Sequence, residues 1–439
     1  MKILLCHNFY QQPGGEDECF RQEGELLQTH GHAVLRYTRH NDDVQKMSSL
    51  GVARQTLFSP RTYREVRELI HRERPDVVHC TNTFPLISPA VYNAAYDEKV
   101  PVVQALHNYR LLCPGALLLR DGNVCESCLG KSFPWPAIQH GCYRDNRLAS
   151  GVVALMLAVH HWRKTWQKRV TLYYALTEFG RRKFIEGGLP ADRMLVKPNF
   201  ITPDPQPASE QGYVAFVGRL SQEKGIRTLL DAWSKLQTPV PLKIAGDGPL
   251  REMVAAAAEA DSRITWLGRV SPAAAVEFVG NASCMILPSL WYEGFPRTII
   301  EAFSRGTPVI ASQLGSMEEV IDHGRTGFHI EPGNPDDICS PLHRRDKLRI
   351  ADRHLLGGDT ARRRRLAKRS CPNHQPSAQT AGPHVGFGRG AADSRFLRLP
   401  TFDVQPCSRL PIFQSTFRKN TMCSGFRSAQ RHTKRRSPR

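Results

Sequence analysis

Two glutamates, Glu293 and Glu301, stand eight residues apart in the stretch WYEGFPRTIIEAFSRGTPVIAS. Proline is favoured at the first position of a helix, so the stretch predicts a helix that begins at Pro296. Such a helix places Glu301 one turn after Arg297, on the same face. The free N–H groups of a helix start, here near Phe295, attract anions. The stretch therefore predicts an anion site with a carboxylate on each side.

Two cations, Arg219 and Lys224, follow another predicted strand in the segment YVAFVGRLSQEKG. The loop that carries them leads into a predicted helix at 225–233. Facing the helix start near Pro296, the two cations would suit a diphosphate, because a guanidinium binds phosphate bidentately and an ammonium acts as a point charge. Taken alone, a solvated loop is the alternative interpretation.

Other loops with small residues also follow predicted strands. AGDGP (245–249) and LGRV (267–270), which ends at Val270, come after the next two strands of the second half. Each loop alone predicts only a turn. Because the carboxyl ends of parallel strands share one edge of a sheet, we expect these loops to surround the same cleft as Glu293 and Glu301.

The first half contains a similar strand-to-helix junction. Gly14 and Gly15 precede a predicted helix at 16–30. Glycines let the backbone approach a ligand closely, and the helix start favours an anion. The spacing is not that of a G-x-G-x-x-G dinucleotide motif, and a flexible turn is the alternative. His107 follows the predicted strand 102–106, where it is either a ligand-binding residue or a structural cap.

Four of the 12 cysteines form a separate pattern, C-x11-C-x2-C-x13-C, in an expected insertion at about 110–150. Four thiolates at such spacing can close a tetrahedral structural zinc site, and C-x2-C is a common part of one. Free thiols and a redox pair are the alternatives. No secretory signal is evident, so we expect reduced thiols in the cytoplasm. The candidate ligands are Cys113, Cys125, Cys128 and Cys142.

Short apolar runs alternate with helical patterns over about the first 340 residues, which is typical of parallel α/β sheets. The pattern lapses at a proline-rich link, 199–212, and then resumes. We therefore predict two doubly wound Rossmann-like domains, 1–200 and 201–341, that face a ligand cleft. The expected strands are 2–6, 33–38, 76–80, 102–106, 172–177 and 194–198, followed by 213–218, 241–246, 263–268, 284–289, 308–312 and 327–331.

The net charge of +19 is concentrated at one end of the chain. Residues 342–439 hold 23 Lys+Arg and 5 Asp+Glu, whereas residues 1–341 hold 37 and 36. The basic segment has no Glu, Tyr or Trp, so it lacks the aromatic platform on which nucleic-acid-binding modules depend. We expect a basic tail of low order or a shifted reading frame, with the second domain truncated. A nucleic-acid-binding module is the third alternative.

The run GVVALMLAVHHWRKTWQKRV (151–170) is apolar and then basic, with Trp162 and Trp166. A membrane-spanning helix needs roughly 20 apolar residues, so we expect no span. One interpretation is a peripheral contact with an anionic bilayer on its cytoplasmic face. The alternative is an ordinary core helix, because the apolar residues of the run would cover nearly every side of the helix.

The second half resembles the group-1 retaining glycosyltransferases of the GT-B architecture, often numbered family 4. The first half resembles them more loosely, and the resemblance covers about residues 1–338. The matching segments of the second half are VGRLSQEKG (217–225), AGDGP (245–249), WLGRV (266–270), the E-x7-E pair in YEGFPRTIIEA, and GTPVIAS with GSMEEVIDHGRTGFHIEPGNPDDI (306–338). Those of the first half are PGGE (13–16), RPDVVHC (74–80), ALHNYR (105–110) and LTEFGRRKF (176–184).

The resemblance implies transfer of a sugar from a nucleotide-sugar donor to an acceptor hydroxyl, with retained anomeric configuration and no metal requirement. It implies that Arg219 and Lys224 hold the donor diphosphate and stabilise the leaving phosphate. Backbone amides near Phe295, Pro296 and Arg297 would share this task. Such a donor would be linked to UDP, GDP or ADP.

The resemblance also implies roles for the remaining residues. Glu301 would accept hydrogen bonds from the ribose and Glu293 from the transferred sugar, while Gly15 would meet the diphosphate and His107 would lie beside the donor sugar. The acceptor would be a cell-surface polysaccharide or a lipid-linked oligosaccharide. The alternatives are a nucleotide-sugar 2-epimerase, an inactive truncated protein, and a nucleic-acid binder that uses the basic tail.

Overall fold

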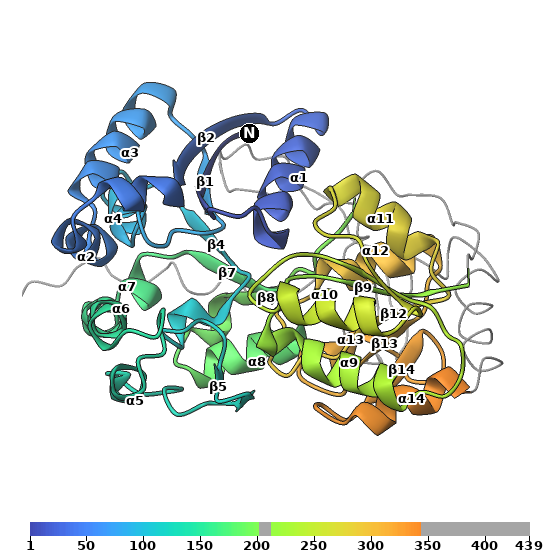
Figure 1. The fold of residues 1–439 in the computed structure, drawn as a ribbon. Coiled ribbons are helices and arrows are strands. Elements are labelled where there is room, and N and C mark those ends of the chain that lie inside the picture. The colour runs from blue at the N-terminus through green and yellow to red at the C-terminus, as the bar shows by residue number, and fades with distance from the viewer. Residues whose placement is uncertain (202–211, 344–439) are drawn as a thin grey trace, which may run out of the picture. The chain divides into compact units, whose positions relative to one another are not determined.

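A computed structural model describes residues 1–201 and 212–343, all of which belong to one compact unit of the chain. Two parallel sheets of six strands dominate it (Figure 1). The prediction of two doubly wound Rossmann-like domains is confirmed. Most of the proline-rich link and the basic tail from residue 344 onward lie outside the described residues.

The first sheet has the strand order β2-β1-β3-β4-β7-β8. All six strands expected in the first half are present, with ends that differ from the expected ones by a few residues. The strands are β1 (Lys2–Phe9), β2 (Ala33–His40), β3 (Val77–Cys80), β4 (Val102–Leu106), β7 (Leu172–Ala175) and β8 (Met194–Val196). The helices are α1 (Gly15–Thr29), α2 (Ser49–Leu57), α3 (Pro60–Glu73), α4 (Ala90–Asp97), α5 (Trp135–Gln139), α6 (Arg147–Trp162), α7 (Thr165–Lys168) and α8 (Glu178–Glu186).

The central strand β1 is apolar on both faces because helices cover both faces. Leu4 and Cys6 belong to the core formed with α3 and α4, whereas Ile3 and Leu5 belong to the core formed with α1. Figure 1 shows α1 on one side of this sheet and α3 with α4 on the other. The strand therefore reads as a continuous apolar run, since alternate side chains enter two separate cores.

The second sheet has the order β11-β10-β9-β12-β13-β14, and it contains the six strands expected in the second half. Its two cores again take alternate residues, so that Ile286 of β12 faces one core and Met285 the other. The strands are β9 (Val214–Val217), β10 (Leu242–Ala245), β11 (Ile264–Trp266), β12 (Cys284–Leu287), β13 (Val309–Ser312) and β14 (Gly327–Ile330). The helices are α9 (Ile226–Lys235), α10 (Arg251–Ala260), α11 (Pro272–Gly280), α12 (Arg297–Arg305), α13 (Ser316–Val320) and α14 (Pro335–His343).

An insertion separates β4 from β7. It contains a small antiparallel hairpin, β5 (Leu119–Arg120) with β6 (Asn123–Val124), which the sequence pattern did not predict because each strand is only two residues long. The predicted run 151–170 is divided between α6 and α7, with Lys164 in a left-handed conformation between them. Within the described ranges, no helix is long and apolar enough to cross a membrane.

Candidate active site

The loops that carry the predicted cations and carboxylates leave two neighbouring strands of the second sheet. β9 and β12 pair with each other, and β9 also pairs with β10, so the strand order reverses between β9 and β12. Ligands of doubly wound sheets bind at such a reversal point, outside the carboxyl ends of the strands. Lys224 follows β9 and Glu293 follows β12, and the topology therefore brings them together.

Lys224 and Glu293 form an ion pair of 2.7 Å between Nζ and Oε1. The Ser289 hydroxyl donates to the same carboxylate oxygen over 2.7 Å. The Ser316 hydroxyl donates to the backbone carbonyl of Glu293 over 2.5 Å. Glu293 is buried. A buried charge without a partner is costly, so the pairing explains how this carboxylate stays in the interior.

Gly225 makes the approach of these loops possible. Its φ is +71°, and a Cβ atom there would overlap the carbonyl oxygen of Pro288. Pro288 lies just after β12, so only a glycine lets the β9 loop lie against the β12 loop. The glycine thus places Lys224, the residue before it, within reach of Glu293.

Arg297 and Glu301 lie one turn apart at the start of α12. The helix begins at Arg297 and has Pro296 as its N-cap residue, one residue later than the sequence predicted, because Pro296 keeps an extended ψ of 121°. The expected shared face is present, with 3.5 Å between Arg297 Nη2 and Glu301 Oε1. Burial raises the pKa of Glu301, and Arg297 offsets part of that rise.

Arg297 also contacts the first domain. Its Nη1 donates to Gln22 Oε1 of α1 over 3.3 Å and to the Phe200 carbonyl over 3.5 Å. A Cβ atom at Gly15 would lie 3.4 Å from Arg297 Cδ. The predicted glycine junction of the first half therefore lies next to the start of α12. Gly15 is exposed, whereas the Gly14 amide already donates to Asp17 over 3.0 Å.

His107 lies against the same loop of the second domain. A Cβ atom at Gly294 would come within 2.8 Å of the His107 carbonyl oxygen, so Gly294 permits this contact. His107 Nε2 is buried and has no hydrogen-bond partner. Burial lowers the pKa of His107 to about 3, so the imidazole is neutral at physiological pH. A neutral imidazole nitrogen can donate or accept one hydrogen bond.

The remaining predicted residues surround this centre with fewer contacts. Phe295 packs against the core cluster of Ala105, Tyr174 and Leu176, and its carbonyl accepts a hydrogen bond of 2.9 Å from Asn199. Arg219 is exposed and forms no ion pair with any residue in the described ranges. Val270 is half-buried, and its neighbour Arg269 donates to the Pro13 carbonyl over 3.3 Å.

A half-buried residue, Glu16, extends the site into the first domain and was not among the predicted site residues. Glu16 Oε2 accepts hydrogen bonds from Tyr10 over 2.7 Å and from Asn108 over 3.2 Å. Glu16 Oε1 is buried without a partner, and burial raises the pKa of this carboxyl. The only signals in the sequence are its position after Gly15 and that of Asn108 after His107.

A second network beside His107 was also missed. Glu23 forms an ion pair with Lys197 and accepts a hydrogen bond of 2.9 Å from Tyr174, and its Oε2 lies 3.7 Å from His79 Nε2. Burial alone would raise the pKa of Glu23, but Lys197, His79 and His107 together lower it to about 2. Its members come from four distant segments, so their spacing gave no sign of it.

The four cysteines of the insertion are reduced thiols. Burial raises the pKa of Cys128 to about 12, and the neighbouring Cys113 adds to the rise. Burial also raises the pKa of Cys142, again with a contribution from Cys113. Over residues 1–201 and 212–343, no group of three or more His, Cys, Asp or Glu side chains is arranged to hold a metal ion. The zinc site stays a prediction.

Two protein-family models match the chain. The model described as glycosyl transferases group 1 matches residues 199–342, and the model described as glycosyl transferase 4-like domain matches residues 14–199. Together the two matches span both Rossmann-like domains and most of the chain.

Two curated relatives and one solved structure show how far the likeness extends. An uncharacterized glycosyltransferase of Methanocaldococcus jannaschii is 33% identical over 30% of this chain and 34% of its own length. A phosphatidyl-myo-inositol mannosyltransferase of Mycobacterium leprae is 29% identical over 46% of this chain and 57% of its own length. The chain thus matches about one third of the length of the first relative and somewhat more than half of the second.

The HepE protein of Anabaena, solved in complex with UDP and glucose, is similar in fold. It has a TM-score of 0.57 at 18% sequence identity, and the match covers 81% of this chain and 94% of that one. At this identity the likeness concerns the fold, and it extends over both sheets.

Proposed function

The chain belongs to the group-1 glycosyltransferases of the GT-B fold, and we propose that it transfers a sugar from a nucleotide-sugar donor to an acceptor hydroxyl with retained anomeric configuration. The observation that carries the proposal is the ion pair of 2.7 Å between half-buried Lys224 and buried Glu293 at the reversal point of the second sheet. It lies one short loop before the start of α12, where Arg297 and Glu301 are paired.

In the proposed complex, the donor diphosphate lies against Lys224, Arg219 and the first amides of α12. Glu301 accepts hydrogen bonds from the ribose hydroxyls, and Glu293 accepts them from the transferred sugar. Arg219 is exposed and forms no ion pair within the described residues, so its guanidinium is available to a phosphate. Residues 201–341 then form the donor domain, and residues 1–200 form the acceptor domain.

The proposed reaction breaks the bond between the anomeric carbon and the diphosphate oxygen. The acceptor oxygen attacks from the same face, and its proton passes to the departing phosphate oxygen. Negative charge develops on that phosphate, and Lys224 stabilises it from a position that needs no reorganisation. Glu293 stabilises the positive charge that develops at the sugar ring.

His107 suits a role beside the donor sugar. Its Nε2 is buried and unpartnered, and it is neutral because burial lowers its pKa to about 3. It therefore offers one hydrogen bond to a sugar hydroxyl without adding a charge that would oppose positive character at the sugar ring. In this arrangement the cations that stabilise the leaving group are Lys224 and Arg219, so the proposed reaction uses no metal ion.

For the acceptor, we propose a glycan or a lipid-linked glycan, used at the cytoplasmic face of a membrane. The similarity to a phosphatidyl-myo-inositol mannosyltransferase supports a lipid-linked acceptor. The fold likeness to HepE, whose crystal structure contains UDP and glucose, makes UDP-sugars the first donors to test.

Thermal denaturation with UDP, GDP and ADP, each with and without its sugar, tests donor binding. A ligand that binds only the folded state raises the melting temperature by mass action. We expect one nucleotide to raise the melting temperature of the wild type and of Arg227→Ala, an exposed cation near Lys224. We expect the rise to vanish in Lys224→Ala. A cleanly melting wild type that responds to no nucleotide would contradict the proposal.

Turnover assays separate the alternatives. Release of nucleotide only when an acceptor is present supports transfer, whereas nucleotide-sugar turnover without an acceptor supports a 2-epimerase. Binding to nucleic acid that weakens steeply as salt rises, and that is lost when residues 342–439 are removed, supports the nucleic-acid binder. Donor binding without any turnover supports an inactive protein.

The structural zinc ion remains a separate proposal that rests on the spacing of Cys113, Cys125, Cys128 and Cys142. Metal analysis of the purified protein tests it. One zinc ion per chain that is lost in Cys125→Ser/Cys128→Ser supports the proposal. A zinc-free protein that melts at the same temperature as this variant contradicts it.

A further inference from the structure

Three large apolar side chains form an exposed line along α6. Leu148 is 84% exposed, Leu155 44% and Trp162 81%. They are spaced by seven residues, which is close to two helical turns, so they lie on the same face of the helix. Other residues of the helix, such as Val153 and Met156, are buried in the core of the first domain. The helix is therefore anchored on one face and apolar on its free face.

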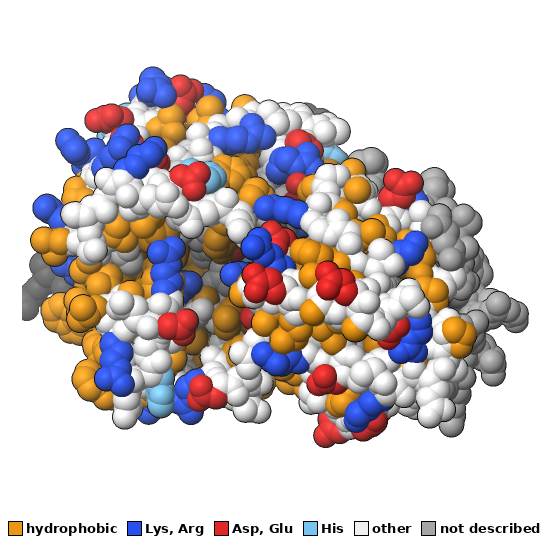
Figure 2. All heavy atoms as spheres, in the orientation of Figure 1, with side chains coloured by type: hydrophobic (Ala, Val, Ile, Leu, Met, Phe, Trp, Pro, Cys, Tyr) orange, Lys and Arg blue, Asp and Glu red, His pale blue; other side chains and the backbone are white. Residues whose placement is uncertain are grey.

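The neighbouring helix α5 extends this apolar line. Phe133 just before α5 and Trp135 at its start are exposed, and α5 packs against α6. Figure 2 shows hydrophobic side chains gathered over α5 and α6. Five of the nine large hydrophobic side chains that are exposed among the described residues lie between 133 and 162. We call these five, Phe133, Trp135, Leu148, Leu155 and Trp162, the α5–α6 apolar surface.

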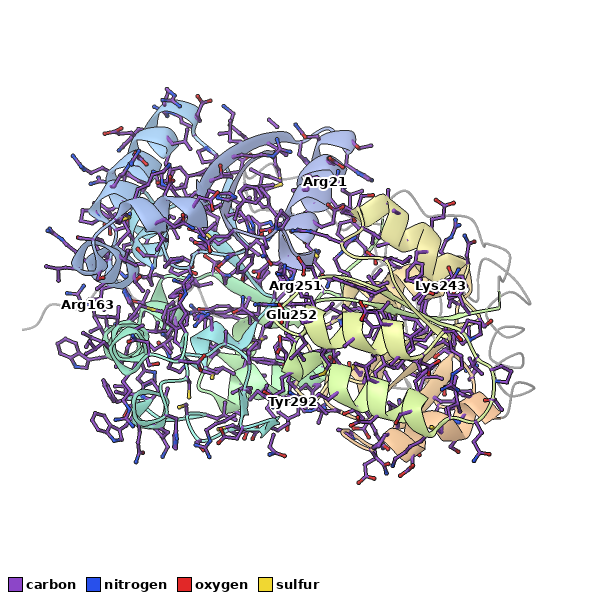
Figure 3. All side chains as sticks on the ribbon, viewed as in Figure 1. Arg21, Arg163, Lys243, Arg251, Glu252 and Tyr292 are labelled. Carbon is purple, nitrogen blue, oxygen red and sulfur yellow. The ribbon has the colours of Figure 1, made fainter. Side chains whose placement is uncertain are left out.

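Basic residues surround this surface. Residues 131–169 contain seven Lys and Arg residues and one acidic residue, Asp145. Arg147 at the start of α6, and Arg163 and Lys164 just after its end, are exposed and form no ion pair with any described residue. Figure 3 shows Arg163 at the outer edge of the first domain, beside α6 and α7. Cations that form no ion pair with a described residue therefore lie at both ends of the apolar line.

We infer that the α5–α6 apolar surface binds an anionic lipid bilayer. An apolar face bordered by lysine and arginine is the arrangement of helices that lie in the headgroup region, with apolar side chains inserted and cations on the phosphates. Tryptophan favours that region because its ring is apolar and its N–H is polar. From Leu148 to Trp162 the line is about 21 Å long, so α6 lies along the bilayer plane.

The positive charge around the α5–α6 apolar surface argues against a second copy of the chain as its binding partner. Two α5–α6 surfaces that met face to face would bring their cations together, whereas anionic headgroups neutralise them. The inference rests on the proposed function for its purpose, because a lipid-linked acceptor must be reached at a membrane. Its physical basis, the apolar line and the cations, is independent of the donor site.

Vesicle flotation of the full chain tests the inference. We expect the wild type to float with vesicles of phosphatidylcholine and phosphatidylglycerol at low salt, and far less with phosphatidylcholine alone. Leu155→Gln/Trp162→Gln should lower the partition by roughly tenfold or more, because two apolar side chains no longer leave water. Leu195→Gln is the matched control, since Leu195 is 55% exposed but lies on β8, outside the surface.

The basic residues 342–439 attract anionic vesicles equally in every variant, so the difference between variants is the decisive result. Phosphatidylcholine labelled with bromine on its acyl chains should quench tryptophan fluorescence through Trp135 and Trp162, and Trp162→Phe should lose the part of that quenching that Trp162 contributes. Equal flotation of the wild type and Leu155→Gln/Trp162→Gln, with no such quenching, would overturn the inference. So would a dimer in solution that Trp162→Gln converts to a monomer.

The nucleotide melting assay separates this inference from the proposed function. Leu155→Gln/Trp162→Gln should keep the nucleotide-induced rise in melting temperature, which also shows that the variant is folded. A wild type that binds vesicles through the surface but responds to no nucleotide would sustain the inference and contradict the proposed function. A wild type that responds to a nucleotide but does not bind vesicles through the surface would contradict only the inference.

Discussion

Two glutamates of the second-domain half of the candidate site and two groups of the first-domain half differ in whether they have partners. In the second domain, Glu293 is paired with Lys224 over 2.7 Å and Glu301 with Arg297 over 3.5 Å. In the first domain, Glu16 Oε1 and His107 Nε2 are buried without partners. An unsatisfied buried polar group costs about 1–3 kcal/mol, a cost that a bound hydroxyl would remove. The comparison suggests that Glu293 and Glu301 are organised in advance, whereas Glu16 and His107 gain their missing partners from a bound ligand.

Breaking the Lys224–Glu293 pair should have the largest effect. Lys224→Ala removes the cation from the leaving group, so we expect turnover to fall by about a thousandfold. The substitution also leaves Glu293 as an unpaired buried charge, which should lower the free energy of unfolding by about 3 kcal/mol. Nucleotide release and denaturant unfolding measure the two effects. Wild-type turnover in Lys224→Ala, with Arg227→Ala as the control, would exclude Lys224 from the mechanism.

A double substitution separates stability from chemistry. Lys224→Met/Glu293→Gln removes both charges, so we expect it to recover about 2 kcal/mol of the stability that Lys224→Ala loses. Turnover should stay at the level of the single variant, because neither the cation nor the carboxylate is restored. A double variant no more stable than Lys224→Ala would show that the pair is not what stabilises this loop.

The strands and the charged residues of the second domain could be predicted from the sequence, whereas the contacts between distant segments could not. Short apolar runs located all twelve main strands, and the central strands read as such runs because they are buried on both faces. Loops at the ends of such strands then converge, which is why Lys224 and Glu293 could be placed in one site. The Glu16 network could not be found, since it depends on hydrogen bonds from Tyr10 and Asn108, which lie on loops after different strands. Nor does a pattern reveal that Arg297 contacts Gln22 of the first domain.

Glu301→Gln should have a smaller effect that is confined to donor binding. The amide keeps the shape of the side chain but lacks the charge that accepts hydrogen bonds from two ribose hydroxyls. We expect the dissociation constant of the nucleotide to rise by about tenfold, or about 1.4 kcal/mol. Burial raises the pKa of Glu301, so removing its charge should not lower stability. Calorimetric titration measures the affinity, with the exposed Glu259→Gln as the control.

Contrary results for Glu301 would bear on the comparison directly. An unchanged nucleotide affinity in Glu301→Gln would mean that the carboxylate belongs to the contact between Arg297 and the first domain, and not to a ribose site. In that case Gln22→Ala should change stability as much as Glu301→Gln does.

The smallest effect concerns pH and tests the first-domain half. Burial lowers the pKa of His107 to about 3 in the folded state, against about 6.5 for an unperturbed histidine. Between these values the unfolded chain binds a proton at His107 that the folded chain does not. Stability contributed by neutral His107 is therefore present at neutral pH and is lost as pH falls below about 6.5.

Denaturant unfolding at two pH values measures this contribution. From about pH 7 to about pH 5, the wild type should lose up to about 2 kcal/mol more than His107→Gln does. Glu23, whose pKa is about 2, stays ionised in the fold over this range, and His79 is present in both proteins. Identical pH profiles would show that His107 is not held in a desolvated position, and would weaken the contrast between the two halves.

The position of Arg297 has a consequence for how the two substrates communicate. One guanidinium serves Glu301 in the second domain and Gln22 and the Phe200 carbonyl in the first. A donor phosphate bound at the start of α12 would lie beside this guanidinium, so we expect donor binding to change the energy of the contact between the domains. Coupling of this kind is reciprocal, and the acceptor should alter donor affinity by the same factor that the donor alters acceptor affinity. Initial-rate kinetics would reveal the coupling as an acceptor affinity that changes with donor concentration, and independent affinities would exclude it.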